Sequence, residues 1–382
     1  MNLRRVSAVA RKEVLHVVRD YRSLLMALAT PGFLLTLFGY ALTLDVDNVP
    51  MVVWDQSQTA RSRELISRFA NANGQGPRYF SIRAPVYNYA DMVRAIDRRE
   101  AMMGLTIPRD FAQRLDAGRD APVQLIVDGS DSNTATIAIG YAEVVAQIYA
   151  LDLTVEQNQR RGSQPLMIPL DVRPRVWFNE DLESRNYIIP GLIAVIMMVI
   201  AAMLTSLTVA REWERGTMEQ LIATPVKPGE LILGKLTPYF AIGICDVAIA
   251  VAMSEFVFHV PLRGNVALLF GMSAIFLIGA LAMGLLVSIV TKSQLLSSQV
   301  AVLTTFLPGF LLSGFIFTIA NMPKAIQFVT YLISARYFVT ILKGIYLKGV
   351  GLEILAAEAL FLIVYATVMV FLARVKLKKK LA

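Results

Sequence analysis

The apolar run at residues 187–209, YIIPGLIAVIMMVIAAMLTSLTV, and the charged stretch that follows at 210–235, AREWERGTMEQLIATPVKPGELILGK, decide the fold. The run is long enough to cross a bilayer as a helix, which takes about 20 residues. The charged stretch leads directly into another apolar run. A polar segment between two spans is held close to the membrane surface, where a soluble partner can reach it.

Apolar runs of this length occur six times. They cover residues 24–44, 187–209, 236–258, 266–290, 299–320 and 354–373. Pro308-Gly309 and Ser313-Gly314 interrupt the fifth run, so we expect that span to be broken or partly re-entrant. Hydrophobic residues make up 55% of the chain, which agrees with membrane insertion. The sequence therefore predicts a polytopic α-helical membrane protein with six transmembrane helices.

Basic residues at both ends of the chain predict its orientation. Arg4, Arg5, Arg11, Lys12, Arg19 and Arg22 precede the first span, and Arg374, Lys376, Lys378, Lys379 and Lys380 follow the last. By the positive-inside bias, both termini and the 210–235 segment face the cytoplasm. The 321–351 segment should then face outward, and its Lys324, Arg336, Lys343 and Lys348 conflict with that placement.

Cysteine and histidine are scarce, which argues against several kinds of site. Cys245 is the only cysteine, so no disulfide can form within the chain. His16 and His259 are the only histidines, and we expect no metal or cofactor to be bound by this chain. The net charge of +8 comes from residues that flank apolar runs, which indicates membrane orientation rather than nucleic-acid binding.

Residues 45–185 form the only large block without a membrane span. Strands are expected at 49–54, 79–83, 102–107 and 123–127, and helices at 59–71, 89–99, 109–117 and 134–157, with 172–178 leading back to the membrane. This alternation predicts an inserted α/β (or α+β) domain. In the six-span topology the domain is extracytoplasmic.

Residues 1–23 predict an amphipathic helix that runs into the first span. Leu3, Val6, Ala10, Val14, Val17 and Tyr21 recur at helical spacing, and most basic residues lie off that line. Such a helix lies in the membrane interface, with its Lys and Arg side chains toward lipid phosphates. An ordinary basic flank is the alternative.

The 210–235 segment carries its own helix signals. Thr217 and Gln220 have the spacing of a capping box, and Gly216 permits a sharp turn before them. Pro225 stops the helix, and Pro228 can start the next one. A short capped helix is therefore expected between the second and third spans.

One face of this short helix is apolar, and it consists of Met218, Leu221 and Ile222. The face suits a groove on a partner protein, whereas a solvated loop that only marks topology is the alternative. Residues 229–236, GELILGKL, nearly match a phosphate-binding loop, but Leu236 replaces the required Ser or Thr and no strand precedes it. We therefore expect no nucleotide site in this chain.

Two acids lie within the third span, Asp246 near its middle and Glu255 near its outer end. A charge at mid-membrane costs at least about 2.5–3.5 kcal/mol, so it normally faces a partner or a cavity. Asp246 could be a proton relay or a substrate contact, or a structural residue bonded to a neighbouring helix. Both interpretations stay open.

Three stretches carry a resemblance to a known family. They are Ala10-Arg-Lys12-Glu13 with Arg19-Asp20 and Leu24; Val123-Gln-Leu-Ile-Val-Asp128-Gly-Ser-Asp131-Ser-Asn133-Thr-Ala; and Arg211-Glu-Trp-Glu-Arg215-Gly216-Thr217-Met-Glu219-Gln220-Leu with Thr224-Pro225 and Gly234-Lys235. Together with the six spans, they resemble the type-2 permease family of ABC exporters, in the bacterial branch with a large outer domain. The resemblance covers nearly the whole chain.

The resemblance implies the permease subunit of an ATP-driven exporter in the bacterial inner membrane, moving a drug-like or amphipathic substrate outward. Two permease copies or paralogues would form a dimer, and separate ATPase subunits, which bind ATP and Mg, would dock on the helices at 1–22 and 211–225. The implied contact residues are Lys12, Glu13, Arg211, Glu212, Glu214, Arg215, Gly216, Thr217, Met218, Glu219, Gln220 and Leu221. This chain itself would not be an enzyme.

The resemblance also implies a layout for the rest of the chain. Residues 186–382 would hold spans two to six, with 210–235 as the cytoplasmic coupling loop and 321–352 as short re-entrant helices near the outer face. A periplasmic adaptor and an outer-membrane channel would be further partners.

Two other functions stay open. One is a non-transporting membrane scaffold or sensor, whose outer domain binds a ligand or a protein. The other is an ion-driven transporter that uses Asp246. Co-purification of an ATPase would favour the exporter, whereas transport that survives ATP depletion would favour the ion-driven alternative.

Overall fold

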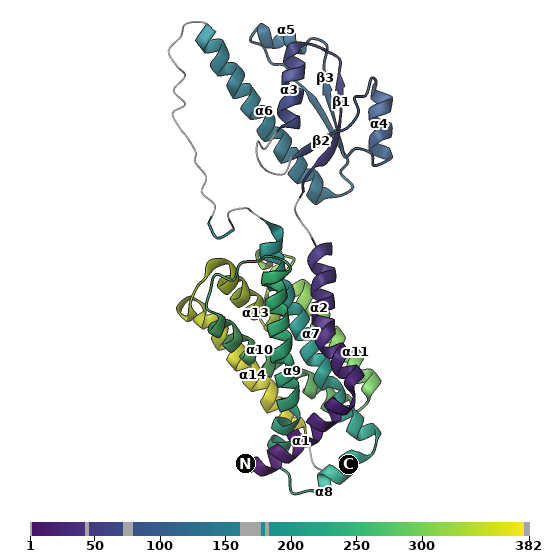
Figure 1. The fold of residues 1–382 in the computed structure, drawn as a ribbon, viewed down its shortest axis with the longest axis vertical. Helices are drawn as coiled ribbons and strands as arrows, with labels where there is room; N and C mark the ends of the chain where they lie inside the picture. The colour runs from purple at the N-terminus through teal and green to yellow at the C-terminus, as the bar shows by residue number, and fades with distance from the viewer. Residues whose placement is uncertain (1, 43–45, 72–78, 161–176, 180–182, 378–382) are drawn as a thin grey trace. The chain divides into compact units, whose positions relative to one another are not determined.

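The computed structural model describes residues 2–42, 46–71, 79–160, 177–179 and 183–377. The chain divides into two compact units (Figure 1). The helical unit comprises Met1–Thr43 and Arg175–Ala382, and the sheet unit comprises Leu44–Pro174. The predicted inserted block, 45–185, extends beyond the sheet unit at its C-terminal end. Most of the predicted 172–178 connection lies outside the described residues.

The helical unit is built around one long central helix, α7. Its helices are α1 (Leu3–Arg19), α2 (Tyr21–Ala41), α7 (Ser184–Glu214), α8 (Thr217–Ala223), α9 (Pro228–Phe256), α10 (Val266–Thr291), α11 (Gln294–Leu312), α12 (Lys324–Thr330), α13 (Ser334–Lys343) and α14 (Leu352–Lys376), with a 3-10 turn at Ile319–Asn321 and a π-helical turn at Gly344–Lys348. Over most of its length α7 is apolar on every side, and it is therefore surrounded by α2, α9, α10, α11 and α13.

Small residues and hydroxyl groups let α10 approach α7 closely. A Cβ atom at Gly284 would lie 2.2 Å from the carbonyl oxygen of Ala202, so a larger residue does not fit there. Thr205 donates from its hydroxyl to a carbonyl of α10 over 2.7 Å, and Ser288 of α10 accepts from the backbone N–H of Ala210 at 2.9 Å. Contacts of this kind join helices where the surroundings are apolar.

Among the described residues, seven helices are long and apolar enough to cross a membrane, which corrects the expectation of six. Six of them, α2, α7, α9, α10, α11 and α14, lie in the helical unit. The seventh is α6 (Ser132–Arg160) of the sheet unit, whose Ala138, Val145 and Leu153 pack into the core of that unit. A helix that covers a sheet can be as long and apolar as a span, so length and composition do not separate the two.

Two predicted span boundaries are wrong. The second span continues as α7 to Glu214, so Arg211 and Glu212 belong to a helix end rather than to a loop. Arg and Glu are good helix formers, and the helix ends only before Gly216, which adopts φ 69°. The fifth span, α11, runs from Gln294 to Leu312 and includes Pro308 without a break, so the interruption expected at Pro308-Gly309 is wrong. The helix does end at the other expected interruption, Ser313-Gly314, where Gly314 adopts φ 79°. A proline is tolerated in a span when its surroundings satisfy the freed backbone groups.

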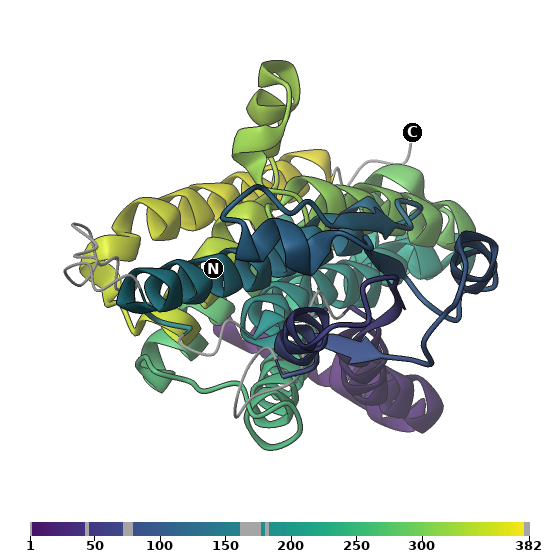
Figure 2. The same ribbon diagram turned by 90° about the horizontal axis from the view of Figure 1, so that it is seen from above.

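The segment predicted to be re-entrant bends sharply. Lys324–Thr330 and Ser334–Lys348 meet at 83°, the geometry of a broken span or a re-entrant loop. In Figure 2 the yellow-green α12 stands away from the other helices. Lys343 donates to the carbonyl of Gly314 at 3.2 Å and lies 3.3 Å from the centre of the Tyr187 ring. Because its charge is held inside the unit, Lys343 is a poor signal of orientation.

The sheet unit contains the strands and helices expected from its alternating pattern. The strands are β1 (Val49–Asp55), β2 (Phe80–Ile82), β3 (Met103–Ile107) and β4 (Gln124–Val127), and the helices are α3 (Ala60–Ala70), α4 (Tyr89–Asp97), α5 (Phe111–Asp116) and α6. The strand order is β2-β1-β3-β4, with β1 parallel to β2 and β3, and β4 antiparallel. Alternate residues of β1 face α3 and α6 on one side and α4 on the other (Figure 1).

The 123–135 stretch ends the sheet and starts α6. Asp128 accepts hydrogen bonds from the backbone N–H and the hydroxyl of Ser130, at 2.9 and 2.6 Å. Asp131 accepts from the hydroxyl of Thr134 at 2.5 Å and from the backbone N–H of Asn133 at 3.1 Å. These bonds hold the pKa of both carboxyl groups below the usual value. Both acids therefore stabilise a turn and a helix start.

Candidate functional site

Four charged side chains meet where α1, α7 and α9 come together. Lys235 of α9 lies 2.8 Å from Glu13 of α1 and 3.0 Å from Glu212 of α7, measured from Nζ to Oε1. Lys12 of α1 reaches the same Glu212 oxygen at 2.8 Å. Lys235, Glu13 and Glu212 are only 1%, 5% and 7% exposed. This charge cluster, Lys12, Glu13, Glu212 and Lys235, joins segments that are far apart in the sequence.

The charge cluster is balanced, with two positive and two negative groups, and that balance makes its burial tolerable. A buried charge without a partner is costly, and removing one partner of a buried pair costs about 3–5 kcal/mol. Tyr239 adds a hydroxyl 3.5 Å from Glu13 Oε2. The second carboxylate oxygen of Glu212 has no hydrogen-bond partner within the described part of the chain. The cluster therefore depends most on its buried members, Lys235, Glu13 and Glu212, whereas the Lys12 side chain is 54% exposed.

Helix α1 also packs directly on α9. A Cβ atom at Gly234 would lie 2.6 Å from Cβ of Val9 and 3.0 Å from the carbonyl oxygen of Val6, so only glycine permits this approach. At the start of α1, the backbone N–H of Asn2 donates to Glu230 Oε1 at 2.7 Å. Steric fit and the charge cluster thus fix α1 to α9 along most of its length.

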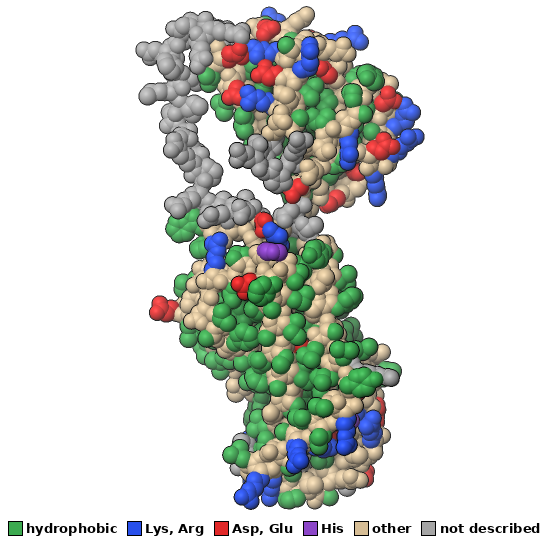
Figure 3. All heavy atoms as spheres, viewed as in Figure 1, with side chains coloured by type: hydrophobic (Ala, Val, Ile, Leu, Met, Phe, Trp, Pro, Cys, Tyr) green, Lys and Arg blue, Asp and Glu red, His purple; other side chains and the backbone are tan. Residues whose placement is uncertain are grey.

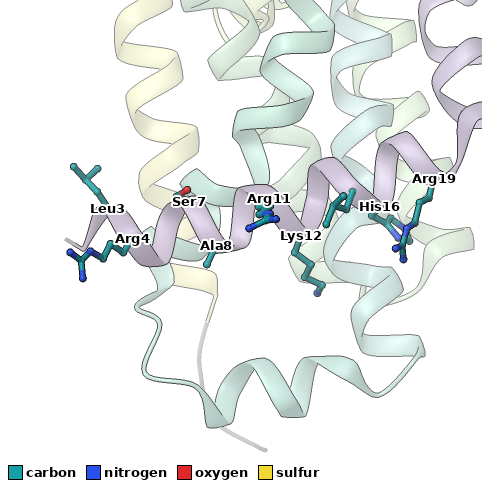
Figure 4. A pocket seen from close by; sticks show the side chains of 9 residues that line it. Leu3, Arg4, Ser7, Ala8, Arg11, Lys12, His16 and Arg19 are labelled. Atoms are coloured by element: carbon teal, nitrogen blue, oxygen red, sulfur yellow. The ribbon is translucent and has the colours of Figure 1, made fainter.

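The rest of α1 is exposed in two strips. Leu3, Val14 and Val18 form an exposed apolar strip, as expected for an interfacial helix. Val6, Ala10 and Val17 of the predicted apolar line are half-buried. The other strip, the basic face, consists of Arg4, Arg11, Lys12, His16 and Arg19 and borders an open hollow of about 930 Å³. Figure 4 shows these side chains along the outer side of α1. The predicted amphipathic helix therefore has a third side, which binds the bundle.

Helix α8 differs from its prediction in how it starts. The N-cap is Gly216 and not Thr217, and no side chain caps the helix, so the expected capping box of Thr217 and Gln220 does not form. The reason is that α7 continues to Glu214 and the chain then needs a left-handed residue to turn. The predicted stop is confirmed, because α8 ends at Ala223, just before Thr224 and Pro225.

The apolar face of α8 is occupied within the chain. Met218 is 1% exposed, and Leu221 and Ile222 pack against the core of the helical unit. The expectation that this face is free for a groove on a partner is therefore wrong. The surface that α8 leaves exposed is polar and contains Glu219 and Gln220.

The predicted contact residues fall into two groups. Glu13, Glu212, Met218 and Leu221 make their contacts within this chain, and so do Lys12, Arg211 and Glu214, while Thr217 is partly buried. Arg215, Gly216, Glu219 and Gln220 are exposed. We define Arg215, Glu219 and Gln220 as the polar patch. It lies at the turn from α7 to α8 and on α8 itself.

Several residues of this site were not identified as contacts from the sequence. Lys235 was interpreted as the start of a span, although Gly234-Lys235 belongs to the stretch that carries the resemblance. Gln294 accepts from Arg211 at 3.4 Å, and its backbone N–H donates to Glu214 at 2.7 Å, which joins the end of α7 to the start of α11. A lysine at the start of a span is common, so the sequence does not indicate the partners of Lys235. They become clear from the three-dimensional structure.

Asp246 and Glu255 are not brought together. Asp246 is fully buried, and neither of its carboxylate oxygens has a hydrogen-bond partner among the described residues. Glu255 is exposed near the end of α9. At a rise of about 1.5 Å per residue, nine residues separate the two by about 13 Å. The described residues also contain no group of three or more side chains that could hold a metal ion.

Comparisons with known proteins agree with this architecture. The family model for "ABC-2 family transporter protein" matches residues 22–375. The chain is 39% identical over 383 residues to the probable multidrug ABC transporter permease YbhS of Escherichia coli (strain K12), which covers all of this chain and 98% of that protein. It is 30% identical to the probable multidrug ABC transporter permease YbhR, over 92% of both chains, and 24% identical to the inner membrane transport permease YhhJ, over 95% and 96%. Both of these are also from Escherichia coli (strain K12).

Proposed function

Because this chain belongs to the ABC-2 family of transporter proteins, we propose that it is the permease subunit of an ATP-driven exporter. The observation that carries the proposal is the family match over residues 22–375, together with 39% identity to a named permease over the full chain. Multi-pass helical membrane proteins of this family are named permeases rather than enzymes, so the energy comes from another chain.

We place the protein in the bacterial inner membrane with both termini in the cytoplasm. In support, Lys and Arg side chains gather at the end of the helical unit that carries α1 (Figure 3), and Arg374 and Lys376 occupy the last turn of α14. The positive-inside bias assigns this end to the cytoplasm. In this orientation α6 stays with the sheet unit on the outer side, and the six apolar helices of the helical unit are the spans.

ATPase subunits dock on two exposed surfaces of the cytoplasmic end, the basic face of α1 and the polar patch beside α8. ATP and Mg bind to those subunits and not to this chain. A polar and charged surface is typical of the rim of a protein interface. The apolar residues of α8 stabilise its position on the bundle, while its exposed residues make the contact.

Motion of the ATPases reaches the spans because both docking elements are fixed to them. The charge cluster joins α1 to α7 and α9 through Lys235, and a turn at Gly216 joins α8 to α7. A displacement of either docking helix therefore moves α7 and α9, and α10 moves with α7 because Gly284 packs against it. Charge pairs and close packing hold these helices together more rigidly than a long flexible loop would.

The substrate we propose is a drug-like or amphipathic compound moved outward, since YbhS and YbhR are named multidrug permeases. A second copy or a paralogue of this chain completes the translocation path. A periplasmic adaptor and an outer-membrane channel then carry the compound across the rest of the envelope. The support for these partners is the resemblance to the family, and no surface of this chain is assigned to them.

Purification from the native membrane tests the proposal, because an ATPase subunit should co-purify. In proteoliposomes, Arg215→Glu combined with Glu219→Lys should lower transport-coupled ATP hydrolysis about tenfold, since like charges across an interface cost several kcal/mol. Glu353→Lys is the matched control, because Glu353 is exposed at the other end of α14 from Lys376. Full coupling in the double variant, or no associated ATPase, would contradict the proposal.

A further inference from the structure

The helical unit contains another cavity, which shares only His16 with the hollow beside the basic face. It has a volume of about 420 Å³ and lies between the turn from α1 to α2, the middle and end of α7, and α9. Its walls include Met26, Met203, Leu207 and Ile242, while its polar end is formed by His16, Asp20 and Arg211. A volume of this size, with apolar walls and a few polar groups at one end, is typical of small-molecule sites.

Arg211 brings a guanidinium to the polar end, where Asp20 is the acid among the lining residues. Its guanidinium donates to His16 Nε2 at 2.5 Å and to Gln294 Oε1 at 3.4 Å. Among the described residues, Arg211 forms no ion pair with a carboxylate, whereas Lys12 and Lys235 nearby are both paired. A guanidinium beside apolar walls favours an anion that it can bind with two parallel hydrogen bonds.

The open side of the cavity faces the apolar surface of the bundle. Met203 of α7 is 41% exposed, and Met26 of α2 is also exposed, so the apolar walls continue onto the part of the surface that lies in the bilayer. In the proposed orientation the polar end lies at the cytoplasmic membrane surface. The cavity is therefore apolar toward the bilayer and polar at the membrane surface. An amphiphile with its apolar body in the bilayer and its charged head at the membrane surface matches this arrangement.

We propose that this cavity binds an amphiphile with a single apolar chain or ring system and a negatively charged head, with the carboxylate, sulfate or phosphate on Arg211. An inner-leaflet lipid and a compound on its way to export share this chemistry. Tyr239 lines the cavity and also contacts Glu13 of the charge cluster. An occupant therefore lies against the junction through which α1 is attached.

Photolabelling of the full-length protein tests the site. The protein is placed in phosphatidylcholine nanodiscs and titrated with a diazirine-bearing dodecanoic acid or with the matching dodecanol, and labelled peptides of α7 are quantified. The acid should label at a concentration at least tenfold lower than the alcohol. Arg211→Gln should remove that difference, whereas Arg215→Gln, the control on the next turn of the chain, should keep it.

A filling substitution gives a second readout that does not depend on Arg211. Met203→Trp should reduce labelling by the acid at least tenfold, while Leu233→Trp should not, because Leu233 is 40% exposed on α9 but does not line the cavity. Phosphatidylglycerol in the nanodisc identifies a resident lipid if it competes, and a free amphiphile if it does not. Equal labelling by acid and alcohol, or unchanged labelling of Met203→Trp, would overturn the proposal.

The assay contains no ATPase, so its outcome is independent of the proposed function. Failure of photolabelling would leave the exporter assignment intact, and failure of ATPase coupling would leave a site for anionic amphiphiles on a membrane protein.

Discussion

Lys235 is the residue that joins three helices, since its ammonium group contacts a carboxylate of α1 and another of α7. From the sequence it has two simple interpretations, as the lysine of a degenerate phosphate loop or as the basic end of a span. The structure gives it a different role, because it is 1% exposed and neutralises two buried acids. One of its two partners, Glu13, is 222 residues away along the chain.

Lys235→Met should destabilise the protein by about 3–5 kcal/mol, because it leaves Glu13 and Glu212 buried with only Lys12 to balance them. Thermal unfolding in detergent would measure this as a lower midpoint. Lys227→Met is the control, since Lys227 is exposed.

The double variant Lys235→Met with Glu13→Gln restores a balanced pair of Lys12 and Glu212. We therefore expect it to unfold at a higher temperature than Lys235→Met alone. A double variant that is less stable than the single one would show that the two residues do not act as a charge pair.

A substitution of Asp246 distinguishes an ATP-driven transporter from an ion-driven one. Its carboxylate is fully buried and has no hydrogen-bond partner among the described residues, so a neutral amide of the same shape should fit. We expect Asp246→Asn to keep at least half of the transport rate and to remain dependent on ATP. Transport assays in vesicles with and without a proton gradient would check this, and a complete loss that follows the gradient would favour an ion-driven mechanism.

At the scale of elements, the fit of α1 on α9 depends on the missing side chain of Gly234. Gly234→Ala places a methyl group 2.6 Å from Cβ of Val9, so α1 must move away. We expect membrane insertion to be normal and ATPase coupling to fall about tenfold, because a clash of this kind costs about 1–3 kcal/mol. Coupled ATP hydrolysis in proteoliposomes is the measurement.

The matched control for Gly234 is Gly229→Ala, because the nearest atom to a Cβ at Gly229 is 4.0 Å away. Val9→Ala combined with Gly234→Ala should recover part of the coupling, since it removes one of the contacting methyl groups. If Gly234→Ala couples normally, the close approach of α1 has no role in transmission.

Elements that are governed by local patterns could be predicted from the sequence, and those that depend on distant partners could not. The strands of the sheet unit and most spans follow from periodicity and apolar length. The continuation of α7 to Glu214 was missed, because charged residues after an apolar run suggest a loop although they are good helix formers. The start of α8 is predicted wrongly for the same reason. Gly216 caps α8 because α7 ends just before it.

The candidate site was predicted in its location but not in its organisation. Arg211, Glu212 and their neighbours do gather with α1, yet the sequence did not separate buried residues from exposed ones. Met218 was assigned to a partner although it packs on the chain's own core. An apolar face of three residues looks the same in both cases, and only the surrounding helices decide which one applies.

For the whole molecule, the location of α6 decides the number of spans. Single cysteines in a Cys245→Ser background, labelled with a membrane-impermeant maleimide, would locate each part. We expect Asp97→Cys in the sheet unit and Leu151→Cys on α6 to react from outside in intact cells. Gln220→Cys should react only after the inner membrane is permeabilised. A protected Leu151→Cys beside a reactive Asp97→Cys would instead place α6 in the bilayer.

In the proposed function, ATPase subunits bind the basic face of α1 and the polar patch beside α8. A photo-crosslinking amino acid at Ala8 or Gln220, both exposed, tests it most directly in native membranes, with Leu303 on the apolar surface of α11 as control. We expect Ala8 and Gln220 each to give a covalent adduct with an ATPase subunit and Leu303 to give none. Adducts at neither position, in membranes where the ATPase co-purifies with the chain, would contradict it.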